Sequence, residues 1–259
     1  MRVLVLDIET RPPLLYAWPP LWDLHASPEQ VVERGRMICF AAKWLDEKKV
    51  MFHSEYQEGG FDGMVAAARD LLDQADIVVH FNGQSFDEKH MQTEIWLARR
   101  RTGDVERFSR PSPFERWDLK KLVAKEFRLD SNKLAYVSRV LDIGEKLKHE
   151  GWALWEGWIN QDPKYIRIME RYNRKDVLLT EELLHEVEDY LPIRIPAPLS
   201  EPDAEGLQFP SCPYCDSTHR EKRGFHYTTV SKYQRYRCLD CLRYYRDTRR
   251  IAGLTTKGL

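Results

Sequence analysis

The sequence predicts an α/β fold with a small second module at its C-terminal end. Three observations support this prediction: a strand that is apolar on both faces opens the chain, helix-like and strand-like segments then alternate to about residue 190, and paired cysteines follow a proline-rich stretch. A length of 259 residues suffices for one large domain with a small appendage.

The first predicted strand carries two acids at its C-terminal end. The apolar run from Val3 to Leu6 continues directly into Asp7, Ile8 and Glu9. Side chains two residues apart share one face of a strand, so Asp7 and Glu9 point the same way. Two such close carboxylates repel each other and tolerate burial best with a cation between them. The pair is therefore half of a candidate divalent-metal site, although a lone acid pair more often marks the solvated end of a strand.

The segments that follow predict a mixed sheet flanked by helices. Strands at 36–45 and 49–54 are separated by a polar turn and are expected to be antiparallel neighbours of the first strand. Two more strands are predicted at 76–81 and 114–119, and helices at 61–74, 85–101, 119–127, 133–141 and 163–190. Asp162 as N-cap and Pro163 at the first helical position mark the start of the last helix.

The composition is that of a globular protein, with 42% hydrophobic and 31% charged residues. No apolar run approaches the length of a membrane span, so no membrane partner is expected. Acids interrupt the N-terminal apolar run, which argues against a secretory signal and favours an intracellular, cytoplasmic location. In that reducing setting the five cysteines are expected to be metal ligands or buried thiols rather than disulfides.

Charge and proline content divide the chain. Residues 209–259 carry 11 Lys and Arg against 4 Asp and Glu, whereas residues 1–208 carry 29 against 37. Five of the fourteen prolines fall between 192 and 210, in a segment that cannot be helical. These features predict a domain over 1–191, a linker over 192–210 and a module over 211–259. The basic end suggests a polyanionic partner.

Two more acids stand at unusual positions. Asp176 occupies an otherwise apolar stripe of the last predicted helix, with Tyr172 one turn before it on the same face. A core-facing carboxylate is bound to a metal, protonated or paired, here with Tyr172 or with a neighbouring Arg or Lys. Ser85 and Glu88 have the spacing of a capping box, which places Asp87 in the first turn of a helix that follows a strand. Asp87 alone is also explained by the helix dipole.

Taken together, these motifs resemble those of a known nuclease family. Asp7-Ile8-Glu9-Thr10, Asn82-x3-Phe86-Asp87 and Tyr172-x3-Asp176 resemble the three exonuclease motifs of the DnaQ-like 3′–5′ exonucleases, in the DEDD group of ribonuclease H-like nucleases. A tyrosine four residues before the last aspartate is typical of the DEDDy subgroup, and the motifs resemble those of the proofreading domains of family B DNA polymerases and of stand-alone exonucleases of that type. The segments Trp117-Asp118-Leu119 and Leu134-x2-Val137-Ser138 also resemble that branch. The resemblance covers residues 1–190 and implies a ribonuclease H-like mixed five-stranded sheet.

The resemblance also implies a set of site residues. Two Mg²⁺ or Mn²⁺ ions would be held by four carboxylates: Asp7, Glu9, Asp87 and Asp176. Tyr172 would lie near the attacking water. Asp118 competes with Asp87 for the third position, and the sequence context favours Asp87. His80 and His90, beside the second motif, are expected to be packing or surface residues.

Two C-x2-C pairs predict a zinc ribbon in the C-terminal module. Cys212 and Cys215 are separated from Cys238 and Cys241 by a segment long enough for a hairpin. Four thiolates in so small a module indicate one tetrahedral, structural Zn²⁺. The remaining cysteine, Cys39, lies in an apolar strand and is expected to be a buried thiol.

Basic and aromatic residues alternate around these cysteines. Cations track phosphates and rings stack on unpaired bases, so the module is expected to bind single-stranded nucleic acid. The expected contacts are Arg223, Tyr233, Arg235, Tyr236, Arg237, Tyr244 and Arg246. The alternative is that the rings form the core of the ribbon and the basic face binds a protein.

These observations favour a metal-dependent 3′–5′ exonuclease that hydrolyses single-stranded DNA ends to nucleoside monophosphates. An RNA exonuclease or a structure-specific nuclease is the near alternative. From another class, the chain could be a recruitment subunit that binds a replication or repair protein through its ribbon. The motifs do not separate DNA from RNA, because such a site contacts phosphates.

Overall fold

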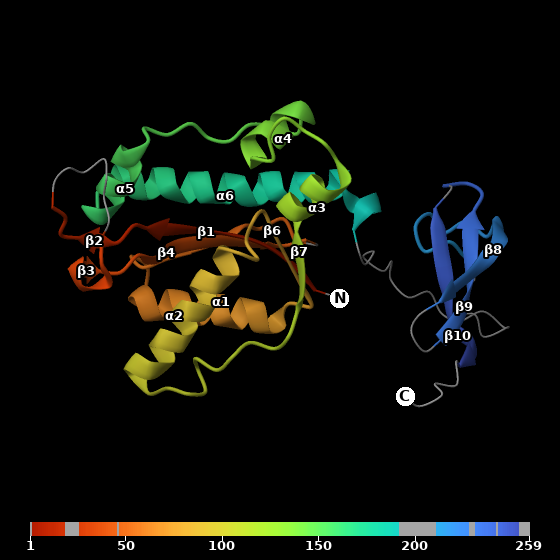
Figure 1. Cartoon of the computed structure of the whole chain (residues 1–259), viewed down its shortest axis with the longest axis horizontal. Helices are drawn as coiled ribbons and strands as arrows, with labels where there is room; N and C mark the ends of the chain where they lie inside the picture. The colour runs from red at the N-terminus through yellow and green to blue at the C-terminus, as the bar shows by residue number, and fades with distance from the viewer. Residues whose placement is uncertain are drawn as a thin grey trace. The chain divides into compact units, whose positions relative to one another are not determined.

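The computed structural model of the chain, shown in Figure 1, divides into two units, Met1–Ile193 and Arg194–Leu259. The structure describes residues 2–18, 26–45, 47–191, 211–227, 231–241 and 243–253. The predicted linker over 192–210 and Asp46 of the predicted polar turn lie outside the described residues.

A mixed five-stranded sheet forms the centre of the first unit. Its strands are β1 (Val3–Arg11), β4 (Arg36–Trp44), β5 (Met51–Ser54), β6 (Ile77–His80) and β7 (Glu115–Asp118), in the order β5-β4-β1-β6-β7. β4 is antiparallel to both β1 and β5, whereas β6 is parallel to both β1 and β7. The predicted mixed sheet and the predicted antiparallel arrangement of the first three strands are therefore confirmed.

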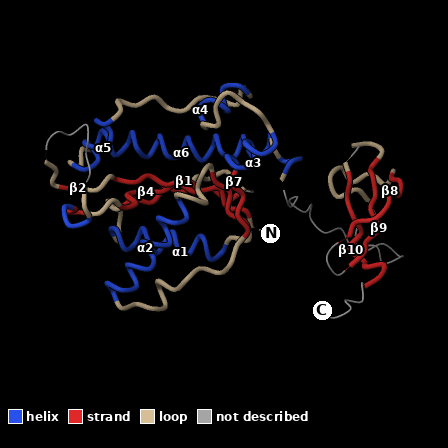
Figure 2. The backbone as a smooth tube through the Cα atoms, in the orientation of Figure 1, coloured by secondary structure: helices blue, strands red, loops and turns tan. Residues whose placement is uncertain are grey.

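Helices cover both faces of this sheet. In Figures 1 and 2, α1 (Gly60–Gln74) and α2 (Asp87–Thr102) lie on one side, and α6 (Pro163–Glu186) runs along the other. Three shorter helices lie around α6: α3 (Leu119–Glu126), α4 (Leu134–Val140) and α5 (Trp152–Ile159). Among the described residues, no helix is both long enough and apolar enough to span a bilayer.

β1 is buried at the centre of the sheet and faces a different helix layer on each side. Leu4, Leu6 and Ile8 belong to one apolar cluster with Met64 of α1 and Met91 of α2. Because side chains alternate along a strand, the residues between them face α6. This alternation directs the two acids of β1 toward the long helix.

Several elements differ from those expected. The capping-box prediction at Ser85 and Glu88 is wrong: α2 begins at Asp87, after the N-cap Phe86, and has no side-chain cap. Glu88 instead pairs with the His80 ring and the Arg116 guanidinium, since a buried carboxylate gains more from two side-chain partners, one of them a cation, than from one backbone N–H. The last helix ends at Glu186 and a 3-10 turn, Glu188–Tyr190, follows it. Not expected at all were the pair β2 (Leu14–Leu15) and β3 (Val31–Glu33), the 3-10 turn Pro28–Gln30, and α5.

The second unit contains a three-stranded antiparallel sheet. Its strands are β8 (Arg220–Tyr227), β9 (Ser231–Cys238) and β10 (Tyr244–Gly253), in the order β10-β9-β8. The stacked rings of Tyr236 and Tyr245, with centroids 5.6 Å apart, pack against Cys212 and Cys238 in a small core. Among its described residues the unit thus buries little apolar surface besides its cysteines, as is usual for a module stabilised by a metal.

Candidate metal centre and basic ribbon surface

The candidate site lies where the carboxyl end of β1 meets α6. Asp7 and Glu9 come from β1, and α6 places Asp176 opposite them. One carboxylate oxygen from each of the three residues lies within 4.8 Å of the other two. The acid that the sequence placed on an apolar stripe, Asp176, is 2% exposed. Three oxygens gathered in this way form a pocket of the kind that a hard divalent cation prefers.

Asp87 lies beside this group without belonging to it. Its Oδ1 accepts the backbone N–H of Ile8 at 3.0 Å, and Ile8 is the residue between Asp7 and Glu9. Burial raises the pKa of Asp87 to about 6, although the nearby His80 opposes the shift. The structure therefore brings three of the four expected carboxylates together and holds the fourth against the same strand.

The acids destabilise one another's charged forms. Burial raises the pKa of Asp7 well above its usual range, and the charges of Asp87, Glu9 and Asp176 raise it further. Burial, followed by the charge of Asp176, raises the pKa of Glu9 to about 8. Such crowding of buried carboxylates is costly without a compensating cation.

Lys146 supplies part of this compensation, and the sequence did not single it out. Its Nζ donates to Asp176 Oδ2 at 2.5 Å and to the Tyr172 hydroxyl at 3.3 Å. Burial alone would lower the pKa of Lys146, but the carboxylate of Asp176 raises it above its usual range. The pKa of Tyr172 rises to about 12, mainly through burial and also through Asp176. The pairing of Asp176 with a lysine was one of the alternatives left open by the sequence.

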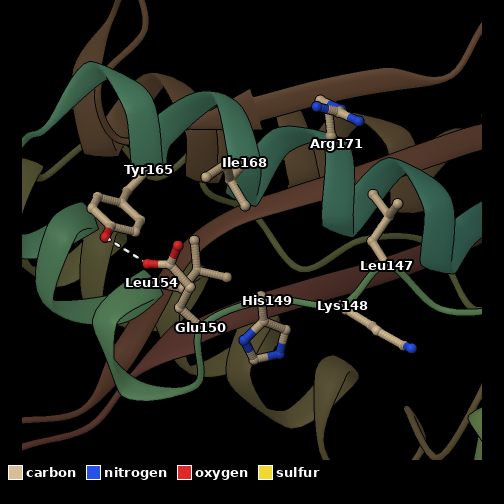
Figure 3. Close-up of a pocket in the computed structure, with 8 residues that line it drawn as sticks. All are labelled: Leu147, Lys148, His149, Glu150, Leu154, Tyr165, Ile168 and Arg171. Carbon is tan, nitrogen blue, oxygen red and sulfur yellow. Dashed lines mark hydrogen bonds between the residues drawn. The ribbon is translucent and has the colours of Figure 1, made fainter.

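Lys146 belongs to a segment, residues 144–150, that has neither helix nor strand. The segment lies beside α6, and Figure 3 shows its residues Leu147 to Glu150 opposite Tyr165, Ile168 and Arg171 of that helix. The segment has no helical or strand-like periodicity, so nothing in the sequence indicated that Lys146 lies beside the acids. The cation at the site therefore could not be placed without the structure.

Two side chains, Asn173 and Trp155, hold β1 at the site by hydrogen bonds. Asn173, which is fully buried, donates from Nδ2 to Asp7 Oδ2 at 2.6 Å and to the Asp7 carbonyl at 3.2 Å. Trp155 of α5 donates from Nε1 to the Thr10 carbonyl at 2.9 Å, next to the register shift between Glu9 and Thr10. Neither residue was expected from the sequence, although Asn173 lies within one turn of Tyr172 and Asp176.

Asp118 has structural contacts instead of a place in the acid group. Its Oδ1 accepts the N–H of Asn82 at 2.9 Å, and its side chain caps the N-terminus of α3. His80 is completely buried and its Nε2 lies 2.7 Å from Glu88. A Cβ at Gly83 would come within 2.4 Å of the His80 ring, so the loop after β6 requires glycine there. His90 packs its ring edge-on against Phe86.

The donor set fits a divalent cation. All of the gathered atoms are carboxylate oxygens, which suit Mg²⁺ and Mn²⁺. Asp176 Oδ1 is buried and, within the described part of the chain, has no hydrogen-bond partner. A buried carboxylate oxygen without a donor is stabilised by a metal ion at that position.

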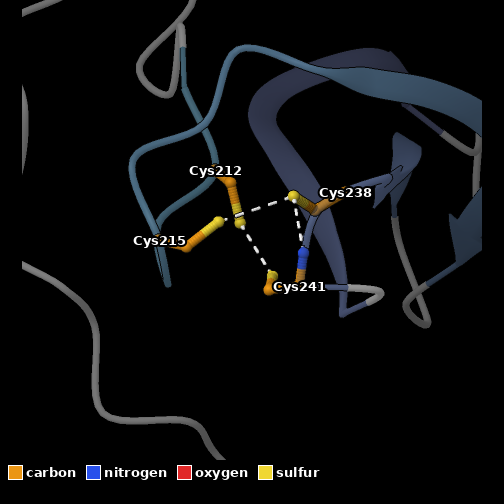
Figure 4. A group of neighbouring side chains, drawn as sticks. All are labelled: Cys212, Cys215, Cys238 and Cys241. Carbon is orange, nitrogen blue, oxygen red and sulfur yellow. Dashed lines mark hydrogen bonds between the residues drawn. The ribbon is translucent and has the colours of Figure 1, made fainter.

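In the second unit, the four expected cysteines converge. Each offers a sulfur within 4.8 Å of the other three, and the Cys212–Cys241 and Cys215–Cys238 sulfur pairs are both 3.6 Å apart (Figure 4). Four ligands about 2.3 Å from a tetrahedral zinc lie roughly 3.8 Å from one another, close to the separations here. Against the effect of burial, backbone N–H groups of Cys241 and Asp240 lower the pKa of Cys238 to about 6. Cys39, by contrast, is buried in β4 as expected.

One face of the ribbon gathers cations and rings. Alternation along β9 puts Tyr233, Arg235 and Arg237 on the same face, and the register with β10 adds Tyr244 and Arg246. The guanidinium carbon of Arg246 lies 4.2 Å from the centroid of the Tyr233 ring. Those of Arg235 and Arg237 lie 5.9 and 5.8 Å from the ring centroid of Tyr244, which is 47% exposed. We call these five residues the basic face.

Two of the expected nucleic-acid contacts are placed differently. Tyr236 is buried on the opposite side of the sheet, where its ring stacks on Tyr245. The Tyr236 ring is part of the ribbon core, which does not favour the expected contact of this residue with nucleic acid. Arg223 is exposed and pairs with Glu221 at 2.7 Å, so its charge is partly compensated.

The raised carboxylate pKa values predict how pH affects stability in buffer without divalent cations. Because the pKa of Glu9 rises from 4.5 to about 8, the folded chain binds this proton more tightly than the unfolded chain does. The contribution of Glu9 to the free energy of unfolding is fully present below about pH 4.5 and is lost as pH rises through 8. Thermal unfolding is therefore expected at a lower temperature at pH 8.5 than at pH 6, and Mn²⁺ should reverse the loss. The Glu9→Gln variant should show a smaller difference between the two pH values, and an unchanged difference would contradict the assignment.

A match to a family model agrees with the fold. The RNase_H superfamily matches residues 31–188, a range that includes Asp87, Tyr172 and Asp176 and begins after β1. The structure of the family B DNA polymerase from the hyperthermophilic archaeon Pyrobaculum calidifontis is similar, with 18% sequence identity and a TM-score of 0.48. The similar region covers 72% of this chain and 24% of the polymerase chain, so this chain spans about a quarter of that relative. No curated protein sequence matches. Since the superfamily match covers more than half of its residues, this chain belongs to the RNase_H superfamily.

Proposed function

We propose that the chain is a metal-dependent 3′–5′ exonuclease of the DnaQ-like DEDDy type, acting on single-stranded DNA ends. The observation that carries the proposal is the convergence of Asp7, Glu9 and Asp176, with the Asp87 carboxylate of α2 hydrogen-bonded to the same strand. Membership of the RNase_H superfamily supports a nuclease in general. The DEDDy type and the 3′–5′ direction rest on the order and spacing of the three acidic motifs, and the preference for DNA rests on their resemblance to the proofreading domains of DNA polymerases.

The carboxylates would hold two Mg²⁺ or Mn²⁺ ions, which neutralise charge on the phosphate and raise the acidity of the attacking water. Asn173 keeps Asp7 in position by donating to its carboxylate. Tyr172, with a pKa of about 12, keeps its proton at neutral pH. It therefore acts as a hydrogen-bonding group that orients water, not as a general base.

Lys146 brings a positive charge next to Asp176 and Tyr172. In the absence of a metal this ammonium compensates one of the acids, and an anionic phosphate entering the site meets the same charge. The proposal thus gives Lys146 an electrostatic role in binding the scissile phosphate. Its position on an irregular segment lets the ammonium adjust as the charge of the site changes.

For the second unit we propose a structural zinc ribbon that holds the substrate strand. The four sulfurs have separations that suit one Zn²⁺. The basic face combines guanidinium groups with an exposed ring, a combination that binds phosphates and stacks on unpaired bases. The body that it serves is acidic, so a separate anchor for a polyanion is needed. A replication or repair protein is the alternative partner for this face.

The first prediction from this proposal concerns the acids. With 5′-labelled single-stranded DNA and Mg²⁺ or Mn²⁺, the chain should give a ladder of shortened labelled products, and EDTA should stop it. Asp7→Ala and Asp176→Ala should reduce cleavage to background, because each removes a metal ligand. Tyr172→Phe should slow cleavage by about tenfold to a hundredfold, the usual effect of removing an orienting group.

Glu182→Ala, which changes an exposed acid on the same helix, is the matched control and should cleave normally. Full activity in either aspartate variant would contradict the site. Duplex DNA and RNA in parallel reactions test the substrate: faster cleavage of RNA would favour the RNA exonuclease, and cleavage within a duplex would favour a structure-specific nuclease.

The second prediction concerns zinc. Elemental analysis should find one zinc per chain after dialysis, and Cys215→Ser should lose it, because three thiolates bind zinc more weakly than four. Cys39→Ala removes the one cysteine outside the cluster and should keep its zinc. Equal zinc content in the two variants would contradict the ribbon assignment.

The third prediction concerns the basic face. Replacing Arg235 and Arg246 by Ala should weaken binding of single-stranded DNA and lower the slope of log affinity against log salt by about 1.4, since each lost phosphate contact contributes about 0.7. Lys48→Ala, an exposed cation of the first unit, should leave the slope unchanged. Deletion of residues 209–259 should abolish this DNA binding. If it leaves DNA binding intact but abolishes binding of a partner protein, the ribbon recruits a protein and does not bind the substrate strand.

A further inference from the structure

A cavity of about 250 Å³ lies against α6 on the N-terminal side of the acid group. Figure 3 shows that it is enclosed by α6, the start of α5 and the irregular segment that also carries Lys146. Leu147, Leu154 and Ile168 contribute aliphatic groups to its lining. The cavity is not used by any of the roles assigned above.

Two ring-bearing residues contribute to the same lining, Tyr165 from α6 and His149 from the irregular segment. The Tyr165 hydroxyl donates to Glu150 Oε2 at 2.8 Å. A Cβ at Gly157 would lie only 2.1 Å from the Tyr165 ring, so this ring rests directly on the backbone of α5. An apolar lining with fixed rings suits a flat, aromatic ligand.

Cations stand at the edge of the cavity. Lys148 and Arg171 line it and are both exposed, and within the described residues neither takes part in an ion pair. The one acid of the lining, Glu150, is engaged by Tyr165 and lies 3.8 Å from Lys164. A flat ligand with phosphate groups on either side therefore matches the cavity better than an uncharged one.

The cavity adjoins the candidate metal centre. The His149 ring packs edge-on against Tyr172, with centroids 5.0 Å apart. Ile168 precedes Tyr172 by four residues on α6, a rise of about 6 Å. Since His149 and Lys146 lie on one short segment, a strand whose phosphate meets Lys146 passes close to the mouth of the cavity.

We propose that this cavity binds one nucleobase of the single-stranded substrate, at a fixed number of nucleotides from the bond that is cleaved. The base lies among Tyr165, His149 and Ile168, and Lys148 and Arg171 meet the phosphates on its two sides. The inference rests on the proposed nuclease function. It adds a site at which the enzyme binds a base of the substrate and not its sugar–phosphate backbone. A base bound at this position would align the scissile phosphate of the strand with the carboxylates.

The test uses oligonucleotides in which a single abasic site is moved, one position at a time, from the 3′ end inward. At one position the missing base should lower kcat/KM by about fivefold to a hundredfold, the effect of losing one stacked base. The Ile168→Trp variant fills the cavity, so it should process the normal strand as poorly as that abasic strand and should lose the position dependence. Leu178→Trp, which adds the same ring at an exposed position of α6, is the matched control and should behave like the wild type.

A binding measurement separates this inference from the nuclease proposal. With 2-aminopurine placed in turn at each position near the 3′ end and no added divalent ion, binding should change its fluorescence at one position in the wild type and in Leu178→Trp, but at none in Ile168→Trp. Thermal unfolding at an unchanged temperature would confirm that Ile168→Trp is folded. The pocket proposal would be overturned if an abasic site lowered kcat/KM equally at every position, or if Ile168→Trp kept the position dependence of the wild type. Either result would leave the nuclease proposal intact. No cleavage by any variant, together with the fluorescence change, would overturn the nuclease and keep the pocket.

Discussion

Repulsion among buried carboxylates is the constraint on which the first unit depends. Asp7 stands between Glu9, Asp176 and Asp87, and each neighbour disfavours its charged form. The donors around the group act against this repulsion: Asn173 donates to Asp7, the Ile8 N–H to Asp87, and Lys146 to Asp176. A group of this kind persists only where the surrounding packing holds it, and the central strand and the long helix provide that packing.

The acids lie on regular elements, whereas the charge that compensates them lies on an irregular segment. Asp7, Glu9 and Asp176 belong to β1 and α6, whose apolar sides are in the core. Lys146 belongs to a segment without regular structure. Displacing the lysine therefore requires no rearrangement of the sheet, whereas displacing an acid would disrupt the core. The arrangement allows a cation to enter the group while the ligands stay in place.

The parts of the site that the sequence predicted are those governed by local periodicity. Two-residue alternation was enough to pair Asp7 with Glu9, and helical spacing was enough to show that Asp176 faces inward. Lys146, Asn173 and Trp155 were not found, because their partners are distant in sequence and no repeating pattern connects them.

The structure places Glu88 and Tyr236 differently from the local sequence pattern, in both cases because of tertiary packing. Glu88 has the spacing of a capping box, but buried partners on other elements took precedence over the local bond. Tyr236 was grouped with Tyr233 because both are aromatic. Side chains alternate along β9, so the Tyr236 ring lies in the core and the Tyr233 ring lies on the basic face. The outline of the fold followed from the order of its segments, since sequential strands tend to be neighbours.

The hydrogen bond between Asn173 and Asp7 joins residues 166 positions apart in the chain. It closes nearly the whole first unit into one loop, and such distant contacts form late because of their entropic cost. A chain emerging from the ribosome would therefore build most of its sheet before any complete acid group exists. Under the proposed function, the timing of synthesis itself keeps an unfinished chain from cutting the nucleic acids around it.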